Sequence, residues 1–109
     1  MRVRFTPSAR RELLEALEFI GQDSPVAADA MLERSVAGLA QLKDFPESGR
    51  VVPEFPGLPY REALVNPYRF FYLITNDVVW IVAVWHERQL PESPTAYLSS
   101  SLKCTASLS

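Results

Sequence analysis

The polar side chains best suited to chemistry lie in one otherwise apolar stretch of the chain, residues 60–88. They are arginines, a tyrosine and the only histidine: Arg61, Arg69, Tyr72, His86 and Arg88, with Arg50 shortly before them. Cleavage of a phosphodiester without a metal needs a base for the attacking hydroxyl, cations for the developing charge and an acid for the leaving oxygen. Histidine, arginine and tyrosine fill these roles when they converge, so this stretch is a candidate site for phosphodiester chemistry.

Each of these residues also has a structural interpretation. Arg61 and Arg88 both stand beside a glutamate, as in surface ion pairs that contribute little to stability. Tyr72 lies among apolar neighbours, as a core aromatic residue would. A single histidine at the end of a strand is more often structural than catalytic. The functional interpretation therefore depends on the grouping of these residues in one segment.

The sequence lacks the common signatures of other enzyme classes. No glycine-rich phosphate loop, HExxH or G-x-S-x-G pattern is present. Cys104 is the single cysteine, so it forms no internal disulfide and no multi-cysteine zinc site. We therefore expect neither a metal nor another cofactor.

Length and composition indicate one globular domain. The 109 residues, of which 48% are apolar and 22% charged, are enough to bury a core. No apolar run approaches the ~20 residues that span a bilayer, and the charged N-terminus is unlike a secretory signal. We therefore expect a cytoplasmic protein. The net charge of −2 argues against a broad nucleic-acid-binding surface, but nine of the eleven cations are arginine, which favours a local site for carboxylate or phosphate.

The first half of the chain predicts a strand and two helices. Residues 2–5 alternate polar and apolar side chains, as in a half-buried strand. Thr6 before a proline predicts the start of a helix that ends at Gly21. Ser24 before a proline predicts a second helix that ends at Phe45. Because so few residues join the two helices, we expect an antiparallel hairpin.

The second half predicts a small sheet. A loop rich in proline and glycine covers residues 46–59. Strands are expected over residues 60–65, 69–75 and 78–85, with a two-residue turn at 76–77. The last strand is apolar on both faces, which is typical of the most central position. The expected fold is α+β: an N-terminal strand, an antiparallel helix hairpin and a three-stranded antiparallel sheet.

The chain divides near residue 90. Residues 1–90 form the expected domain, and residues 91–109 are rich in serine and are expected to be a loosely ordered tail. Two helices cover only one face of a sheet, so large apolar side chains are left for a helical or extended partner to cover. Phe71, Trp80 and Trp85 are the candidates for that contact.

Over about residues 2–90 the chain resembles the RelE/ParE superfamily of bacterial toxins from type II toxin–antitoxin modules. The matching pieces, in order, are VRFTPSARREL, SPVAADAMLE, FPESGR, YREALVNPYRFFYLI and VVWIVAVWHER. The resemblance implies a small toxin that is neutralised by a cognate antitoxin, for which the apolar candidates above would form the docking surface. It implies either of two targets: ParE-like members poison DNA gyrase, and RelE-like members cleave mRNA on the ribosome without a metal.

The sequence favours the gyrase branch. No lysine lies between Lys43 and Lys103, whereas RelE-like nucleases tend to carry lysines beside their active-site arginines. If the chain is RelE-like, the resemblance implies a metal-independent endoribonuclease whose catalytic residues are Arg61, Arg69, Tyr72 and His86. Arg50 and Arg88 would then contact the nucleic acid or the target. A third hypothesis is an inactive module that binds antitoxin. None of these functions needs a membrane or a small-molecule cofactor.

Overall fold

The computed structural model describes residues 1–89 of the chain. The elements follow in the order β1 (Arg2–Phe5), α1 (Pro7–Asp23), α2 (Pro25–Asp44), β2 (Arg50–Val51), β3 (Arg61–Val65), β4 (Tyr68–Thr75) and β5 (Val78–His86). The expected tail over residues 91–109 lies outside the described residues. Within residues 1–89, no helix combines the length and the apolar character needed to cross a membrane.

Both helices begin where the sequence predicts, because a capping hydroxyl precedes a proline at each start. The Thr6 hydroxyl accepts the N–H of Ala9 at 3.2 Å, and the Ser24 hydroxyl accepts the N–H of Ala27 at 3.1 Å. The predicted end of the first helix at Gly21 is wrong by two residues. No described glycine has a positive φ, so Gly21 does not form a left-handed cap and α1 continues to the extended backbone at Ser24.

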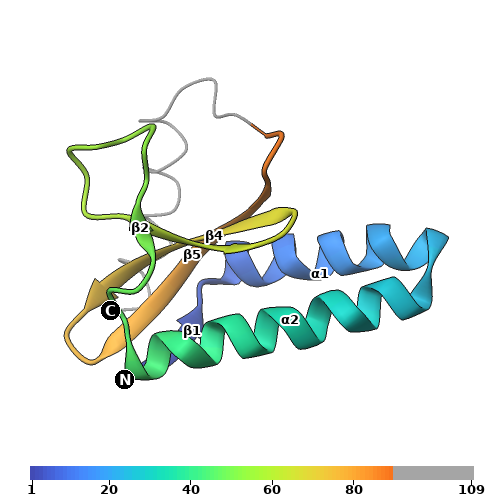
Figure 1. The fold of residues 1–109 in the computed structure, drawn as a ribbon, viewed down its shortest axis with the longest axis horizontal. Helices are drawn as coiled ribbons and strands as arrows, with labels where there is room; N and C mark the ends of the chain where they lie inside the picture. Colours follow the sequence, from blue (N-terminus) through green and yellow to red (C-terminus); the bar gives the residue numbers. More distant parts are fainter. Residues whose placement is uncertain (90–109) are drawn as a thin grey trace.

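The two helices lie side by side and antiparallel, as predicted, and cover one face of the sheet (Figure 1). The end of the hairpin that carries their connection reaches beyond the sheet. α2 ends at Asp44, directly before the predicted stop at Phe45. Met31 and Leu42 of α2 pack with the sheet in the main core, which therefore lies between the hairpin and the strands.

The sheet contains five strands in the order β1-β5-β4-β3-β2, instead of the three that were expected. β3, β4 and β5 are antiparallel neighbours, as predicted. Asn76, in the tight turn before β5, has a φ of 50°, which asparagine tolerates. β1 adds in parallel to β5, starting with Arg2 opposite Val78, and β2 adds two residues beside β3. The pairing of β1 with β5 joins segments far apart in the chain, so it leaves no local signal in the sequence.

Strand β4 is the centre of the sheet, which corrects the expectation that β5 would be. Its first five residues, from Tyr68 to Tyr72, are all buried. The apolar character of β5 has a different cause: β1 flanks it, α1 packs against it, and its far face carries a second core.

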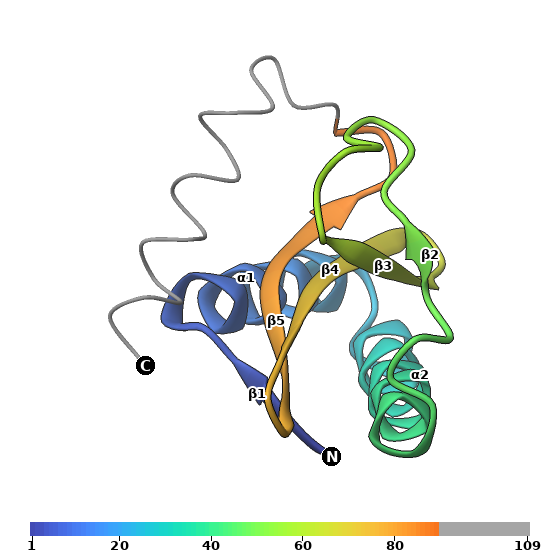
Figure 2. The ribbon, with the colours of Figure 1, turned by 90° about the vertical axis from the view of Figure 1, so that its left-hand side faces the viewer.

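That second core lies on the face of the sheet opposite the helices. Val52, Phe55 and Tyr60, from the proline-rich loop between β2 and β3, pack against Phe71 and Val82 of the sheet. Figure 2 shows this loop on the side of β2 and β3 that faces away from α2. The chain therefore covers with its own loop part of the face that we expected a partner to cover.

Candidate functional site

Arg69 lies on the central strand with its guanidinium engaged by two carboxylates. Its Nε donates to Glu62 Oε2 at 2.5 Å, and its terminal nitrogens donate to the two oxygens of Glu54 at 2.7 and 2.8 Å. The Arg69 and Glu62 side chains are only 7% and 2% exposed. The guanidinium carbon also lies 4.9 Å from the centre of the Phe71 ring. Because Arg50 of β2 bonds to the same Glu62, this cluster ties β2, β3, β4 and the proline-rich loop together.

The charges in this cluster stabilise one another. The paired hydrogen bonds from Arg69 lower the pKa of the Glu54 carboxyl, and the same bonds raise the pKa of Arg69. Three of the five N–H donors of the arginine point at carboxylates. The charge of Arg69 is therefore neutralised within the fold.

Replacing Glu54 with glutamine is expected to make the free energy of unfolding depend less on pH under acidic conditions. The pKa of Glu54 is lower in the folded protein than its value of about 4.3 in the unfolded chain. The ionised carboxylate therefore contributes stability above about pH 4.3, and this contribution is lost as the pH falls through the folded-state pKa. The natural chain should therefore lose stability more steeply than the variant below about pH 4. Urea unfolding at a series of pH values measures this, and parallel profiles would contradict the ion pair.

Arg61 and Tyr72 face each other across β3 and β4, and both hold the segment that follows α2. The Tyr72 hydroxyl donates to the Pro46 carbonyl at 2.8 Å and accepts the Gly49 N–H at 2.9 Å. Arg61 Nη1 donates to the carbonyls of Gly49 and Glu47 at 2.8 and 3.3 Å. Burial raises the pKa of Tyr72. Both side chains thus bind backbone and position the entry into β2.

Replacing Tyr72 with phenylalanine is expected to lower the free energy of unfolding by about 1–3 kcal/mol, because the variant loses the hydroxyl that Gly49 and Pro46 bind. Tyr60→Phe is the matched control. The buried Tyr60 hydroxyl has no hydrogen-bond partner in the described part of the chain, so its removal should be neutral or stabilising. Urea denaturation compares the two variants. Equal losses would mean that the Tyr72 hydroxyl does not hold the loop.

His86 ends β5 opposite Tyr68, and the two rings meet edge to face with centres 5.3 Å apart. Its Nδ1 accepts the backbone N–H of Arg88 at 3.0 Å, and its own backbone N–H donates to Gln89 Oε1 at 2.8 Å. In the neutral ring, this pattern leaves the proton on Nε2. His86 therefore helps to terminate the strand and retains one nitrogen for other contacts.

The four residues expected to be catalytic do not converge in the described structure. Arg69 lies on the face that the loop covers, whereas Tyr72 and Tyr68 belong to the core on the helix side. On that side, Arg61 is opposite Tyr72, and His86 is opposite Tyr68. Tyr68 and Tyr72 are four positions apart along β4, which separates the two pairs by about 13 Å. Only Arg61 and Tyr72 are neighbours. Residues 1–89 also contain no group of three or more His, Cys, Asp or Glu that could hold a metal.

The three aromatic residues expected to meet a partner differ in exposure. Phe71 is 2% exposed beneath the proline-rich loop, whereas Trp80 and Trp85 are half-buried. Glu12 of α1, which the sequence did not single out as functional, accepts the indole N–H of Trp85 at 3.0 Å and the backbone N–H of Val84 at 3.1 Å. Burial raises the pKa of Glu12. Glu12 therefore joins α1 to the end of β5 and orients Trp85.

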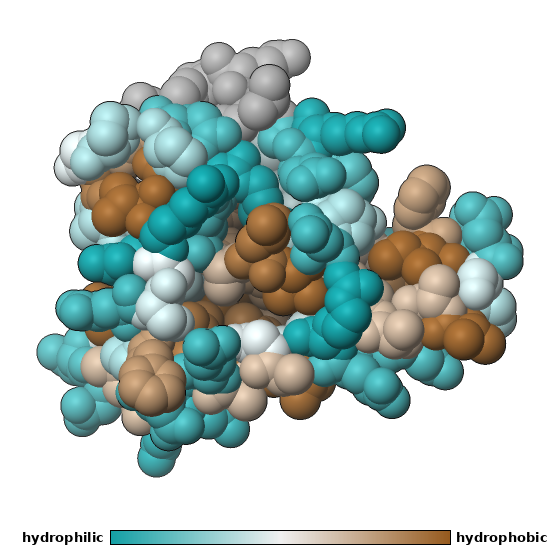
Figure 3. Space-filling model, in the orientation of Figure 1, coloured by the Kyte–Doolittle hydropathy of each residue, from teal (hydrophilic) through white to brown (hydrophobic). Residues whose placement is uncertain are grey.

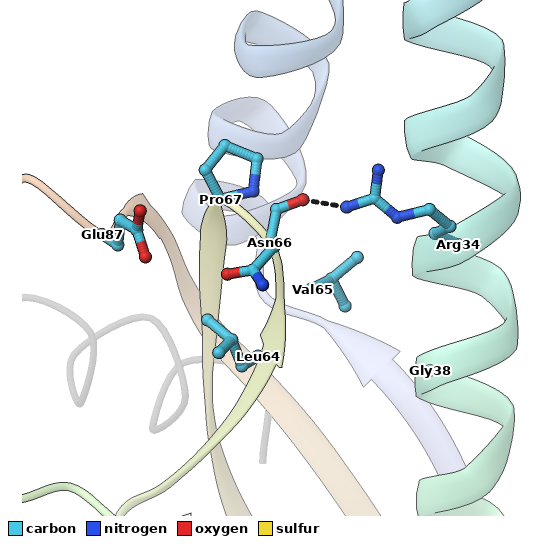
Figure 4. Close-up of a pocket in the computed structure, with 7 residues that line it drawn as sticks. All are labelled: Arg34, Gly38, Leu64, Val65, Asn66, Pro67 and Glu87. Atoms are coloured by element: carbon cyan, nitrogen blue, oxygen red, sulfur yellow. Dashed lines mark hydrogen bonds between the residues drawn. The ribbon is translucent and has the colours of Figure 1, made fainter.

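A cleft of about 740 Å³ separates α2 from the turn between β3 and β4 (Figure 4). Its walls include Arg34 and Gly38 on one side and Leu64 and Val65 on the other. The Arg34 guanidinium reaches across and bonds to the Asn66 carbonyl. Apolar side chains gather between α2 and the sheet on this side of the molecule (Figure 3). The cleft lacks a cluster of acidic and basic groups suited to catalysis.

Three comparisons relate this geometry to known proteins. A sequence model of the family described as "ParE toxin of type II toxin-antitoxin system, parDE" matches residues 3–91. The curated protein Toxin RelE2 from Caulobacter vibrioides is 33% identical over 89 residues, which are 81% of this chain and 97% of that protein. A chain from the chromosomal ParDE TA system of P. aeruginosa has the same fold, with a TM-score of 0.62 and 16% identity over 79% of this chain and 95% of that chain.

Proposed function

This chain belongs to the ParE toxin family of type II toxin–antitoxin systems, and we propose that it stops growth by binding DNA gyrase. Membership of the family implies an antitoxin as partner. In this proposal Arg50 and Arg88, both exposed, contact the target, and the antitoxin covers Trp80 and Trp85, beside the buried Phe71. The protein acts in the cytoplasm, where gyrase works on DNA.

The dispersal of the expected catalytic residues is the observation that carries the proposal. A metal-independent ribonuclease needs its base, acid and cations within hydrogen-bond reach of one phosphate. Here Arg69 binds carboxylates on one face, while Tyr72 and His86 lie at separate places on the other. A toxin that acts by binding needs a stable surface and no such convergence, so this arrangement supports the gyrase branch.

The charge balance of the sheet supports the same proposal. Residues 50–88 contain four arginines and four acidic residues. Two of those arginines, Arg50 and Arg69, already pair with glutamates. Binding of mRNA depends on a surplus of cations that replace counterions on the phosphates. Residues 50–88 have no such surplus.

RNA cleavage is the second candidate, because the curated relative at 33% identity is named Toxin RelE2. His86 is half-buried at the end of β5, and with Nδ1 bonded to the backbone N–H of Arg88 its Nε2 is the ring nitrogen that an RNA substrate would meet.

The test is to induce the chain without antitoxin and to follow methionine incorporation in the first minutes, together with supercoiling by purified gyrase. Inhibition of supercoiling while translation continues would support gyrase as the target. Immediate collapse of translation with cleaved mRNA would overturn it in favour of the ribonuclease. If neither activity changes and growth continues, the chain is an inactive module that binds antitoxin.

Replacing His86 with alanine is expected to leave growth inhibition close to that of the natural chain. The proposed activity does not use the His86 ring, which meets Tyr68 edge to face and accepts the backbone N–H of Arg88. A general acid in a ribonuclease would instead cost a factor of about 10²–10⁴ when removed. Growth curves at matched protein levels measure the effect, and a thermal melt checks that the variant is folded.

A further inference from the structure

The outer side of α2, which faces away from the sheet, carries an apolar stripe. Leu32 and Val36 lie on it and are 44% and 61% exposed, and Ala40 continues it one turn later. The buried residues of the helix, Met31, Ser35 and Leu42, face the other way. Figure 2 shows no other part of residues 1–89 over the outer side of α2. A helix that is apolar on its inner and its outer side indicates that a second element packs on it.

Opposite charges lie at the two ends of this stripe. Asp29 lies seven residues before Val36, and Lys43 lies seven residues after it. Seven residues are close to two helical turns, so the three side chains share one face. Asp29 and Lys43 are exposed, and neither side chain has an ion-pair partner within residues 1–89. The stripe is therefore acidic at one end, apolar in the middle and basic at the other end.

The remaining charges around the stripe either add to this pattern or lie beside it. Glu33 adds a negative charge to the first half. The Met1 ammonium donates to the Lys43 carbonyl at 3.1 Å and adds a positive charge to the second half. Arg34 points the other way and bonds to the turn between β3 and β4. Asp44 follows Lys43 but lies about 100° farther around the helix.

A second copy of the same helix matches this pattern when the two helices pack antiparallel. A two-fold axis beside Val36 brings the two copies of this residue together and sets residues at equal distances before and after it level with each other. Asp29 of each copy then meets Lys43 of the other. Parallel packing would instead place each charge beside its own copy, where like charges repel. The order of the charges therefore selects a second copy in the antiparallel orientation.

We propose that α2 packs antiparallel on α2 of a second copy of this chain and forms a two-fold dimer of the free protein. Val36 lies at the centre of the contact, and two Asp29–Lys43 pairs close its ends. A single pair of helices makes a small interface, so the dimer is reversible, with a Kd at or above about 1 μM. The contact uses none of the residues that the proposed function assigns to antitoxin or target, so it does not depend on that proposal.

Sedimentation velocity of the purified full chain over a range of concentrations tests the dimer. We expect the mass to rise from monomer toward dimer as the concentration increases. Val36→Glu places two carboxylates at the axis and should weaken the dimer at least about hundredfold. Val26→Glu is the matched control: Val26 is 78% exposed on the same helix but lies about 80° around it from Val36, and its replacement should leave the dimer unchanged.

Exchanging the charges tests the antiparallel orientation. Asp29→Lys sets two lysines together at each end of the contact and should weaken the dimer about tenfold. Asp29→Lys combined with Lys43→Asp restores opposite charges, so we expect the dimer to recover. Glu18→Lys makes the same charge change on the exposed surface of α1 and should have no effect. A combined variant that associates no better than Asp29→Lys would overturn the antiparallel pairing.

A disulfide at the axis locates the contact directly. Cys104 is the single cysteine, so Val36→Cys in a Cys104→Ser background places one thiol of each copy at the two-fold axis. Oxidised glutathione should then link the chains into a covalent dimer, because the two Cβ atoms come close there. Glu18→Cys in the same background should stay monomeric. A natural chain that is monomeric at every concentration, or a dimer that Val36→Glu leaves intact, would overturn the proposal.

Discussion

Replacing Arg69 with alanine is expected to lower the free energy of unfolding by about 3–5 kcal/mol. The change leaves the Glu62 carboxylate, whose side chain is 2% exposed, without its buried partner. It also frees Glu54, the only carboxylate that fastens the proline-rich loop to Arg69 in the described structure. Since small domains are typically stable by about 5–15 kcal/mol, this loss would remove a large part of the stability of the protein. Urea denaturation measures the loss.

Arg88→Ala is the control for this change, because Arg88 is exposed at the end of the sheet and should alter stability by less than about 0.5 kcal/mol. Arg69→Lys adds a second comparison: it keeps the charge but loses the planar fork that binds both oxygens of Glu54. We expect lysine to recover only part of the stability. An Arg69→Ala variant that unfolds like the natural chain but has lost toxicity would instead place Arg69 in contact with a target.

Replacing Gly49 with alanine is expected to cost about 2–4 kcal/mol, although the position has an ordinary backbone conformation. A Cβ atom there would lie 2.5 Å from the Glu62 carbonyl oxygen and 2.7 Å from Tyr72 Cε1, and nearer still to the Tyr72 hydroxyl. The backbone would have to move, which breaks the Gly49 N–H bond to that hydroxyl and disturbs the pairing of β2.

Gly57→Ala is the matched control, since a Cβ atom at that position meets nothing within 4 Å. It should leave the free energy of unfolding nearly unchanged. Combining Gly49→Ala with Tyr72→Phe tests the cause. Removing the hydroxyl relieves one close contact but not the one with the Glu62 carbonyl, so the double variant should stay strongly destabilised. Recovery to the level of Tyr72→Phe alone would show that the hydroxyl was the sole obstacle.

Both predictions bear on how toxicity experiments with this protein are interpreted. Arg69 and Tyr72 fall at positions where the family resemblance suggested catalysis, yet each holds part of the loop between α2 and β3. Loss of toxicity in variants of either residue must therefore be compared with their loss of stability before it is assigned to chemistry. His86, which ends a strand and holds no loop by its side chain, is the better probe of chemistry.

Two contacts of the site, made by Glu12 and Glu54, were not predicted from the sequence. Glu12 lies three residues after Ala9 and four before Ala16, on the stripe of α1 that faces the core. A carboxylate on such a stripe indicates a buried hydrogen-bond acceptor, which Trp85 and Val84 use. Glu54 had no comparable signal, because its partner Arg69 is fifteen residues away and on a different element.

Local chemistry determined much of this protein from the sequence alone. The hydroxyl caps at Thr6 and Ser24 determined both helix starts, and the apolar runs separated by turn residues indicated three antiparallel strands and the turn at Asn76. Each of these depends on residues within a few positions of one another, so each can be predicted from the residues themselves.

Tertiary structure alone decided the rest. Whether β1 joins the sheet, which face Arg69 occupies and how far His86 lies from Tyr72 depend on which strands pair and in which register. A strand assigns alternate side chains to opposite faces, so a correct list of polar residues still leaves open which of them meet. The sequence therefore identified the family and the helices and strands, and only the fold could separate residues that a linear segment had grouped.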